Sequence, residues 1–100
     1  MGYNSGMKIV GFLWLPEIIE KLAVKHSVAE HEVEQVFANG AKIRFMEKGD
    51  RLGEDLYLAL GQSDAGRYLA VLFIYKHTQQ AMIVSARDMA SKERKTYGRK

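Results

Sequence analysis

The spacing of the apolar residues changes at Gly40. Before this glycine, apolar residues recur every three or four positions, which is the spacing of one face of an α-helix. After it, apolar and polar residues alternate in several short segments, which is the spacing of a β-strand with one buried face. The sequence therefore predicts helices mainly in the first part of the chain and a sheet mainly in the second.

Two helices are predicted before Gly40. The first spans residues 16–26 and begins with Pro16, which suits a first helical turn because its missing N–H would have no partner there. The second begins at a capping box, in which the Ser27 hydroxyl and the Glu30 carboxylate each bond a backbone N–H. Gly40 ends it, because glycine adopts the left-handed conformation at little cost. The apolar face of the first helix holds Ile18, Ile19, Leu22, Ala23 and His26.

Five strands and a last helix complete the predicted fold. The strands are expected at residues 8–14, 41–46, 55–61, 68–75 and 81–86, and the last helix at 89–97. Segment 68–75 is almost continuously apolar, which is typical of a central strand covered on both faces. Short connections favour antiparallel neighbours. We therefore expect an α+β fold, an antiparallel sheet with two N-terminal helices and one C-terminal helix.

The last predicted hairpin fixes how far apart two candidate residues lie. A turn of two or four residues between the last two strands places Ala70 opposite Arg87. His77 is then six or seven residue pairs from Arg87, roughly 20 Å at the usual rise of a strand. One flat site therefore cannot contain both residues.

Length and composition limit the domain count and the compartment. One hundred residues make one domain, expected at 8–97 between a flexible leader at 1–7 and a basic tail at 98–100. The chain has no Cys, which excludes a disulfide scaffold, a thiolate metal site and a Cys nucleophile. No apolar run reaches the roughly 18 residues of a membrane span, and no cleavage site of a secretory signal follows the apolar stretch 9–15. We expect a cytoplasmic protein that does not bind membranes.

The net charge of +3 is concentrated at the C-terminal end. Residues 91–100 hold five Lys and Arg against one Glu, which is 5 − 1 = +4, so the other ninety residues sum to 3 − 4 = −1. A basic end permits a polyanion partner. It also agrees with the ordinary preference of cations for the C-terminus of a helix.

Several common kinds of catalytic site are missing from the sequence. No Gly-rich loop joins a strand to a helix, and no Ser lies in a nucleophile elbow. His26, His31 and His77 are scattered, and without a ligand helix or Cys we expect no metal site and no cofactor.

The remaining candidates are cationic and aromatic. A ribonuclease that works without metal needs a base for the 2′-OH, cations for the charge on phosphorus and an acid for the leaving 5′-oxygen. Each candidate also has an ordinary structural interpretation, such as a core histidine for His26 or a helix anchor for Tyr97. Arg87 is the hardest to explain structurally, because it ends an apolar strand just before a helix, where backbone N–H groups face an anion. The candidates are Lys25, His26, Lys76, His77, Arg87, Arg94 and Tyr97.

These residues belong to a longer pattern that resembles the BrnT family of bacterial toxins, the ribonuclease partners in BrnT–BrnA toxin–antitoxin modules. The resemblance runs from about Phe12 to Tyr97 and rests on the order and spacing of several short motifs. In chain order these are Phe12-Leu13-Trp14 with Pro16, Lys25-His26-Ser27-Val28, Gly53-Glu54, Ala59-Leu60-Gly61, Gly66-Arg67, Val84-Ser85-Ala86-Arg87, Glu93-Arg94 and Tyr97.

The resemblance implies a RelE-like ribonuclease fold and metal-independent RNA cleavage that inhibits translation. It also implies tight binding by an antitoxin, a BrnA-like protein of the ribbon-helix-helix class, in a possible dimer or heterotetramer, and repression by the pair of its own operon. The catalytic residues expected on this basis are Arg87, Arg94, Tyr97 and His77. The expected RNA-binding residues are Lys25, His26, Arg67 and Lys76.

Three positions depart from the family pattern. Leu56, Gln80 and Met82 stand where basic residues are expected. An alternative function is therefore a catalytically weakened module that binds an antitoxin-like partner protein. A third hypothesis is a simple RNA-binding domain that uses the basic tail.

Overall fold

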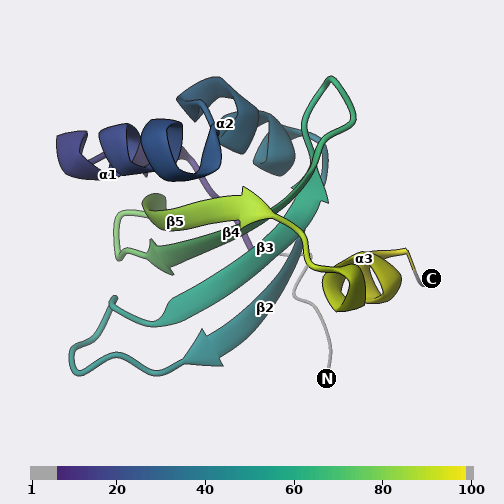
Figure 1. The fold of residues 1–100 in the computed structure, drawn as a ribbon. Coiled ribbons are helices and arrows are strands. Elements are labelled where there is room, and N and C mark those ends of the chain that lie inside the picture. The colour runs from purple at the N-terminus through teal and green to yellow at the C-terminus, as the bar shows by residue number, and fades with distance from the viewer. Residues whose placement is uncertain (1–6, 99–100) are drawn as a thin grey trace.

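The structure, a computed structural model, describes residues 7–98. Figure 1 shows α1 and α2 over the sheet and α3 beyond the end of β5. The α+β class predicted from the sequence is confirmed, with two N-terminal helices and one C-terminal helix. In chain order the elements are β1 (Gly11–Leu13), α1 (Pro16–Lys21), η1 (Leu22–His26), α2 (Glu30–Ala38), β2 (Lys42–Glu47), β3 (Leu56–Gln62), β4 (Tyr68–Tyr75), β5 (Gln80–Asp88) and α3 (Ser91–Tyr97).

The sheet is mixed rather than wholly antiparallel. Its strand order is β1-β5-β4-β3-β2, so β4 is central, as its apolar sequence predicted. Strands β2 to β5 pair antiparallel, but β1 pairs with β5 in parallel. The reason is that β1 is not joined to its neighbour by a hairpin. The elements from α1 to β4 lie between β1 and β5 in the sequence, and a connection of this length allows parallel pairing.

The Lys76 N–H donates to the Gln80 carbonyl at 2.9 Å, so the turn beyond this last bonded pair of the hairpin has three residues, 77–79, not the two or four expected. Gln79 closes it in the left-handed conformation, at φ 65°. The odd loop length shifts the pairing by one residue near the loop, where Tyr75 pairs with Ala81. A bulge further along β5 compensates for the shift, so Ala70 still pairs with Arg87 as predicted.

The helix starting at residue 16 extends to His26, as expected, but its second half, η1, is a π-helix. The predicted capping box at Ser27 is wrong. Ser27 instead ends η1 in the left-handed conformation, at φ 54°. Helix α2 therefore starts at Glu30, and the carboxylate that caps it is Glu32, whose Oε1 accepts the Ala29 N–H at 3.0 Å.

Both faces of the sheet are packed against helices, but unequally. The alternation predicted for β3 is confirmed, with Ala59 in the larger cluster under α1, η1 and α2 and Leu58 in a smaller one under α3. Helix α2 approaches β3 closely at Gly61, where an added Cβ would lie 2.9 Å from Val36 Cγ1. The smaller cluster consists of Leu58, Leu60, Ala70 and Met89, with Tyr68, Leu72 and Tyr97 against it.

Within residues 7–98, no helix is long and apolar enough to cross a membrane. Most of the predicted leader, residues 1–6, and most of the predicted tail, residues 99–100, lie outside the described residues.

Candidate functional site

Arg87 lies at the end of β5 and forms an ion pair with Glu93 in the first turn of α3. Its Nη1 and Nη2 donate to Oε1 and Oε2 of Glu93 at 2.7 and 2.9 Å. The Oε1 atom also accepts the Ala90 N–H at 2.8 Å, which satisfies a free donor at the start of the helix. One carboxylate therefore joins the strand end to the helix start and sets the direction of the Arg87 guanidinium.

Both members of this pair are charged at neutral pH. The hydrogen bond from Arg87 is the main reason that the pKa of Glu93 lies below its ordinary value, with the Ala90 N–H and the charge of Arg44 acting in the same direction. The described hydrogen bonds use three of the five N–H donors of Arg87. Its Nε and one Nη2 donor remain for an anion such as a phosphate.

A cleft of about 310 Å³ lies beside Glu93, between α3 and the strands β2 and β3. Arg44, Lys92, Leu58 and Leu60 line it together with Glu93. Sequence reasoning missed Arg44, Lys92 and Glu93 as site residues. The pairing of Arg44 with Leu58 could have placed Arg44 on the face that α3 covers, but that required knowing where α3 packs.

Arg94 and Tyr97 hold α3 to the sheet through a shared partner. The Arg94 guanidinium lies 4.0 Å from the Tyr68 ring centroid, and the Tyr97 ring meets Tyr68 edge-on at 6.0 Å. Lys42 Nζ donates to the Tyr97 carbonyl at 2.6 Å. The structure thus brings Arg87, Arg94 and Tyr97 to one face of the sheet. However, Tyr97 lines a neighbouring hollow with Asn39 and Gln62, not the cleft beside Glu93.

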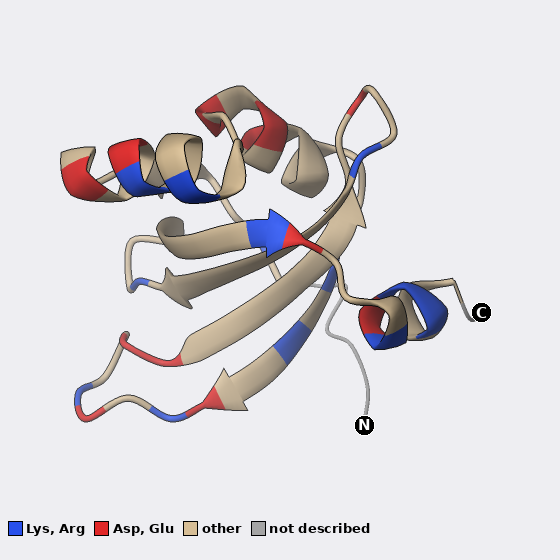
Figure 2. Ribbon diagram, in the orientation of Figure 1, with Lys and Arg blue, Asp and Glu red and all other residues tan. Residues whose placement is uncertain are grey.

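Positive charge gathers on this face. Figure 2 shows Lys and Arg along β2, at the end of β5 and around α3. Glu93 is the acidic residue among them, and Asp88, the neighbour of Arg87 in β5, is engaged by Arg67. We call this set the basic α3 face. Its cations are Lys42, Arg44, Arg87, Lys92, Arg94 and Lys95.

Arg67 joins elements that lie far apart in the sequence. All five of its N–H donors are engaged, and its side chain is only 26% exposed. Hydrogen bonding to Arg67 is the main reason that the pKa of Asp88 is lowered. These contacts give Arg67 a clear structural role, and its predicted contact with RNA stays a prediction. The acceptors are Asp88 Oδ1 and Oδ2, the carboxylate of Glu32 and the carbonyls of His26 and Ser27.

The predicted pair Lys25 and His26 lies at the end of η1. Lys25 is exposed, and His26 is half-buried. Arg67 donates both to the His26 carbonyl and to Asp88, which places the end of η1 near the end of β5. The pair therefore approaches the strand end that carries Arg87.

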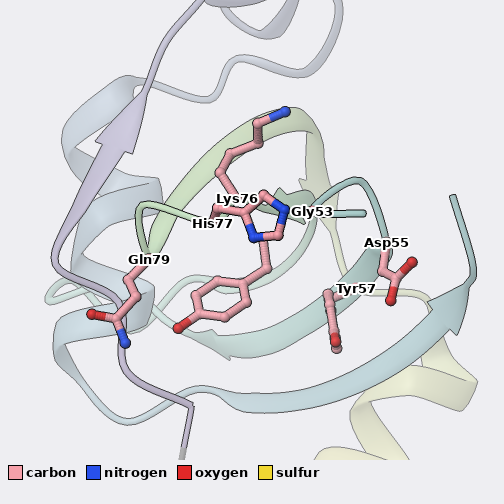
Figure 3. A pocket seen from close by; sticks show the side chains of 7 residues that line it. Gly53, Asp55, Tyr57, Lys76, His77 and Gln79 are labelled. Atoms are coloured by element: carbon pink, nitrogen blue, oxygen red, sulfur yellow. The ribbon is translucent and has the colours of Figure 1, made fainter. Parts of the chain in front are cut away.

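Lys76 and His77 lie at the opposite end of β5, as the hairpin prediction indicated. They line a separate cleft of about 350 Å³ with Tyr57 and Asp55 (Figure 3). Lys76 Nζ contacts Glu54 Oε2 at 3.3 Å. Burial, with the nearby charge of Asp55, raises the pKa of Tyr57, so its hydroxyl is protonated at neutral pH.

Among residues 7–98, no group of three or more His, Cys, Asp or Glu side chains is arranged to hold a metal ion.

Comparison with known proteins gives these features their context. A family model described as the ribonuclease toxin, BrnT, of type II toxin-antitoxin systems matches residues 14–93. The protein is therefore a ribonuclease toxin of the type II class, a class in which the toxin is paired with an antitoxin. Within that class, the chain belongs to the BrnT family.

A solved structure agrees with this assignment. The fold is similar to the crystal structure of the Brucella abortus ribonuclease toxin BrnT, with a TM-score of 0.61 and 19% sequence identity. The match covers 81% of this chain and 97% of the Brucella chain. At this identity the likeness shows a shared fold. No curated protein matches the sequence significantly.

Proposed function

We propose that the protein cleaves RNA without a metal ion on the basic α3 face, and thereby inhibits translation in the cytoplasm. The observation that supports this most is the Arg87–Glu93 pair beside the cleft lined by Arg44 and Lys92. A phosphodiester needs cations around its phosphate and a base near its 2′-OH, and these residue types provide both.

In this mechanism each group has one task. The free N–H donors of Arg87 bind a non-bridging phosphate oxygen and stabilise the charge that grows as the 2′-oxygen attacks phosphorus. Arg44 and Lys92 hold the neighbouring phosphates. Glu93 is ionised, lines the cleft and accepts the proton of the 2′-OH. As the 2′-oxygen bonds to phosphorus, the bond from phosphorus to the 5′-oxygen breaks, and water in the open cleft protonates the leaving 5′-oxygen. Arg94 stacks on Tyr68 and holds α3 in place, so that Glu93 keeps its position.

Inducible expression in a bacterial host tests this proposal. Wild-type protein should stop growth and the incorporation of labelled amino acids, and Arg87→Ala should not. Arg51→Ala is the matched control, because Arg51 is an exposed arginine in the loop between β2 and β3. If wild-type protein arrests growth no more than Arg87→Ala does, the proposal is wrong.

The alternative, a weakened toxin that mainly binds its partner, is favoured by one feature of the sheet. Four half-buried apolar residues form a row across β1, β5, β4 and β3 on the face that α3 covers only in part. Leu56 and Met82, where basic residues are expected, both belong to this apolar row. Its members are Leu13, Met82, Ile74 and Leu56.

We propose that the antitoxin, a small protein of the ribbon-helix-helix class, covers the apolar row. Its presence there would also obstruct the neighbouring cleft. Co-expression followed by light scattering on the purified complex measures the stoichiometry, for which a heterotetramer is expected. Met82→Lys should release the antitoxin, and Lys48→Ala, in the exposed loop, should not. Retention of the antitoxin by Met82→Lys would place its binding surface elsewhere.

A further inference from the structure

The cleft that contains His77 has no task in the proposed cleavage. It lies at the end of β5 remote from Arg87, and β5 is nine residues long, so about 25 Å separate the two. Its volume of about 350 Å³ is at the lower end of the range for small-ligand pockets. The cleft is thus large enough for one flat heterocycle.

Aromatic rings form the walls of this cleft. Tyr57 and Tyr75 meet at right angles, with centroids 6.3 Å apart, and Phe45, 51% exposed, meets Tyr57 edge-on at 5.7 Å. The His77 ring lies close against Gly53, where an added Cβ would be 2.8 Å from His77 Cδ2. Gly53 is also at φ 78°, so both its size and its conformation keep the ring in this position. Such rings stack on nucleobases in proteins that bind single strands.

The polar groups of the cleft select among flat ligands. Figure 3 shows Asp55 and Gln79 on opposite sides of the rings. Asp55 Oδ1 accepts the Gly49 N–H at 2.9 Å, which fixes the carboxylate. A carboxylate is an acceptor only, and it repels a phosphate. It therefore favours a neutral ring with two adjacent N–H donors.

Among the four RNA bases, guanine has such an edge. Its N1–H and N2–H₂ groups point the same way, whereas adenine and cytosine present a donor beside an acceptor, and uracil presents a single N–H. On another edge, guanine carries the acceptors O6 and N7, which suit the amide N–H₂ of Gln79. Lys76 lies at the same cleft, paired with Glu54 at 3.3 Å, and supplies a cation for the phosphate of the same nucleotide.

We propose that this cleft is a base-binding subsite that holds one unstacked guanine of single-stranded RNA. The inference rests on the proposed function in one respect, that the natural ligand is RNA. His77 stacks on the base, Tyr57 contacts the edge of the base, Asp55 binds its N1–H and N2–H₂ groups, and Gln79 binds the opposite side. The subsite gives the enzyme a sequence preference at a distance from the bond that is cleaved.

Binding of mononucleotides, followed by NMR, tests the subsite directly. GMP added to the full-length protein should shift the ring signals of His77 and Tyr57 saturably, with a Kd at least fivefold lower than for AMP, CMP or UMP. His77→Ala should weaken GMP binding at least fivefold. His31→Ala is the matched control, because His31 is an exposed histidine on α2. Asp55→Asn should remove the preference for GMP.

The possible outcomes separate this inference from the proposed function. Arg87→Ala should bind GMP like wild-type protein while losing RNA cleavage. Absence of saturable shifts with every nucleotide would overturn the subsite, and equal affinity for all four would overturn its assignment to guanine. Normal cleavage by Arg87→Ala alongside normal GMP binding would overturn the proposed function alone. Thermal unfolding of His77→Ala, an exposed loop variant, checks that it is folded.

Discussion

Arg87 and Glu93 bind each other through two parallel hydrogen bonds, Nη1 to Oε1 at 2.7 Å and Nη2 to Oε2 at 2.9 Å, across the junction of β5 and α3. The same Glu93 oxygen Oε1 caps α3 through the Ala90 N–H. The pair that we assign to catalysis therefore also stabilises the fold, because it joins β5 to the start of α3. Substitutions there must be assessed for stability as well as for activity.

The first prediction concerns the pH dependence of stability. The pKa of Glu93 in the folded state lies below its ordinary value of 4.5, so ionised Glu93 stabilises the fold above that pH, and the stabilisation is lost as the pH falls through the folded-state pKa. Glu93→Gln should lower the free energy of unfolding by about 1 kcal/mol at pH 7. Urea unfolding from pH 7 to pH 3 should show the difference from wild type shrinking below about pH 4.5.

The control is Glu20→Gln on α1, an exposed carboxylate with no described ion pair. Its stability difference from wild type should stay near zero at every pH. A constant difference between Glu93→Gln and wild type across the whole range would contradict the electrostatic account of the junction.

The second prediction concerns Arg67. Arg67→Lys keeps the charge but cannot reproduce a planar fork with five donors. Since the Arg67 fork joins η1, α2 and β5, the loss should cost about 2 kcal/mol of unfolding free energy. Arg51→Lys, in the exposed loop, should change it by less than about 0.5 kcal/mol. Equal effects of the two substitutions would show that the Arg67 contacts contribute nothing specific.

The third prediction concerns the salt dependence of RNA binding. A 2′-O-methyl oligonucleotide binds without being cleaved, because its 2′-oxygen is blocked. The double variant Lys92→Ala/Lys95→Ala removes two cations of the basic α3 face. The slope of log K against log salt should become shallower by about 0.7 for each lost phosphate contact. Lys21→Ala/Lys48→Ala removes the same charge elsewhere and should leave the slope unchanged, and an equal change in both variants would argue against the basic α3 face.

The fourth prediction concerns Tyr97, which the family resemblance named as a catalytic residue. Its described contacts use the ring and the backbone carbonyl, and it lines a different hollow from Glu93. Tyr97→Phe should therefore keep the unfolding free energy within about 0.5 kcal/mol and cleave RNA within about threefold of the wild-type rate. A fall of about 100-fold at unchanged stability would instead assign proton transfer to the Tyr97 hydroxyl.

The periodic parts of the fold could be predicted from the sequence, and the parts set by backbone detail could not. The alternation of apolar residues in β3 correctly predicted which side chains lie on each face of the sheet. The continuous apolar run of β4 correctly predicted that this strand is central. The capping box was misplaced because the left-handed Ser27 ends a π-helix, a conformation with no pattern of its own in the sequence. The loop length before β5 was missed because Gln79, not a glycine, takes the positive φ.

The part of the candidate site whose residues are close in the sequence could be predicted, and the part that depends on packing between distant elements could not. Arg87, Arg94 and Tyr97 are close in the sequence, so the strand–helix junction indicated their common face. Arg44 lies in a distant strand, and only the packing of α3 over β2 and β3 brings it to Glu93. The total charge of −1 outside the last ten residues also concealed the cations that Figure 2 shows on β2 and at the end of β5.

The most direct test of the central claim is the single-turnover rate of RNA cleavage by purified protein in the presence of EDTA. Wild type and Arg51→Ala should cleave at the same rate. Arg87→Ala should be slower by about 100-fold or more, the usual cost of removing one donor that stabilises transition-state charge, and Arg87→Lys should recover only part of the loss. Cleavage by Arg87→Ala at the wild-type rate, or cleavage that stops in EDTA, would contradict the account.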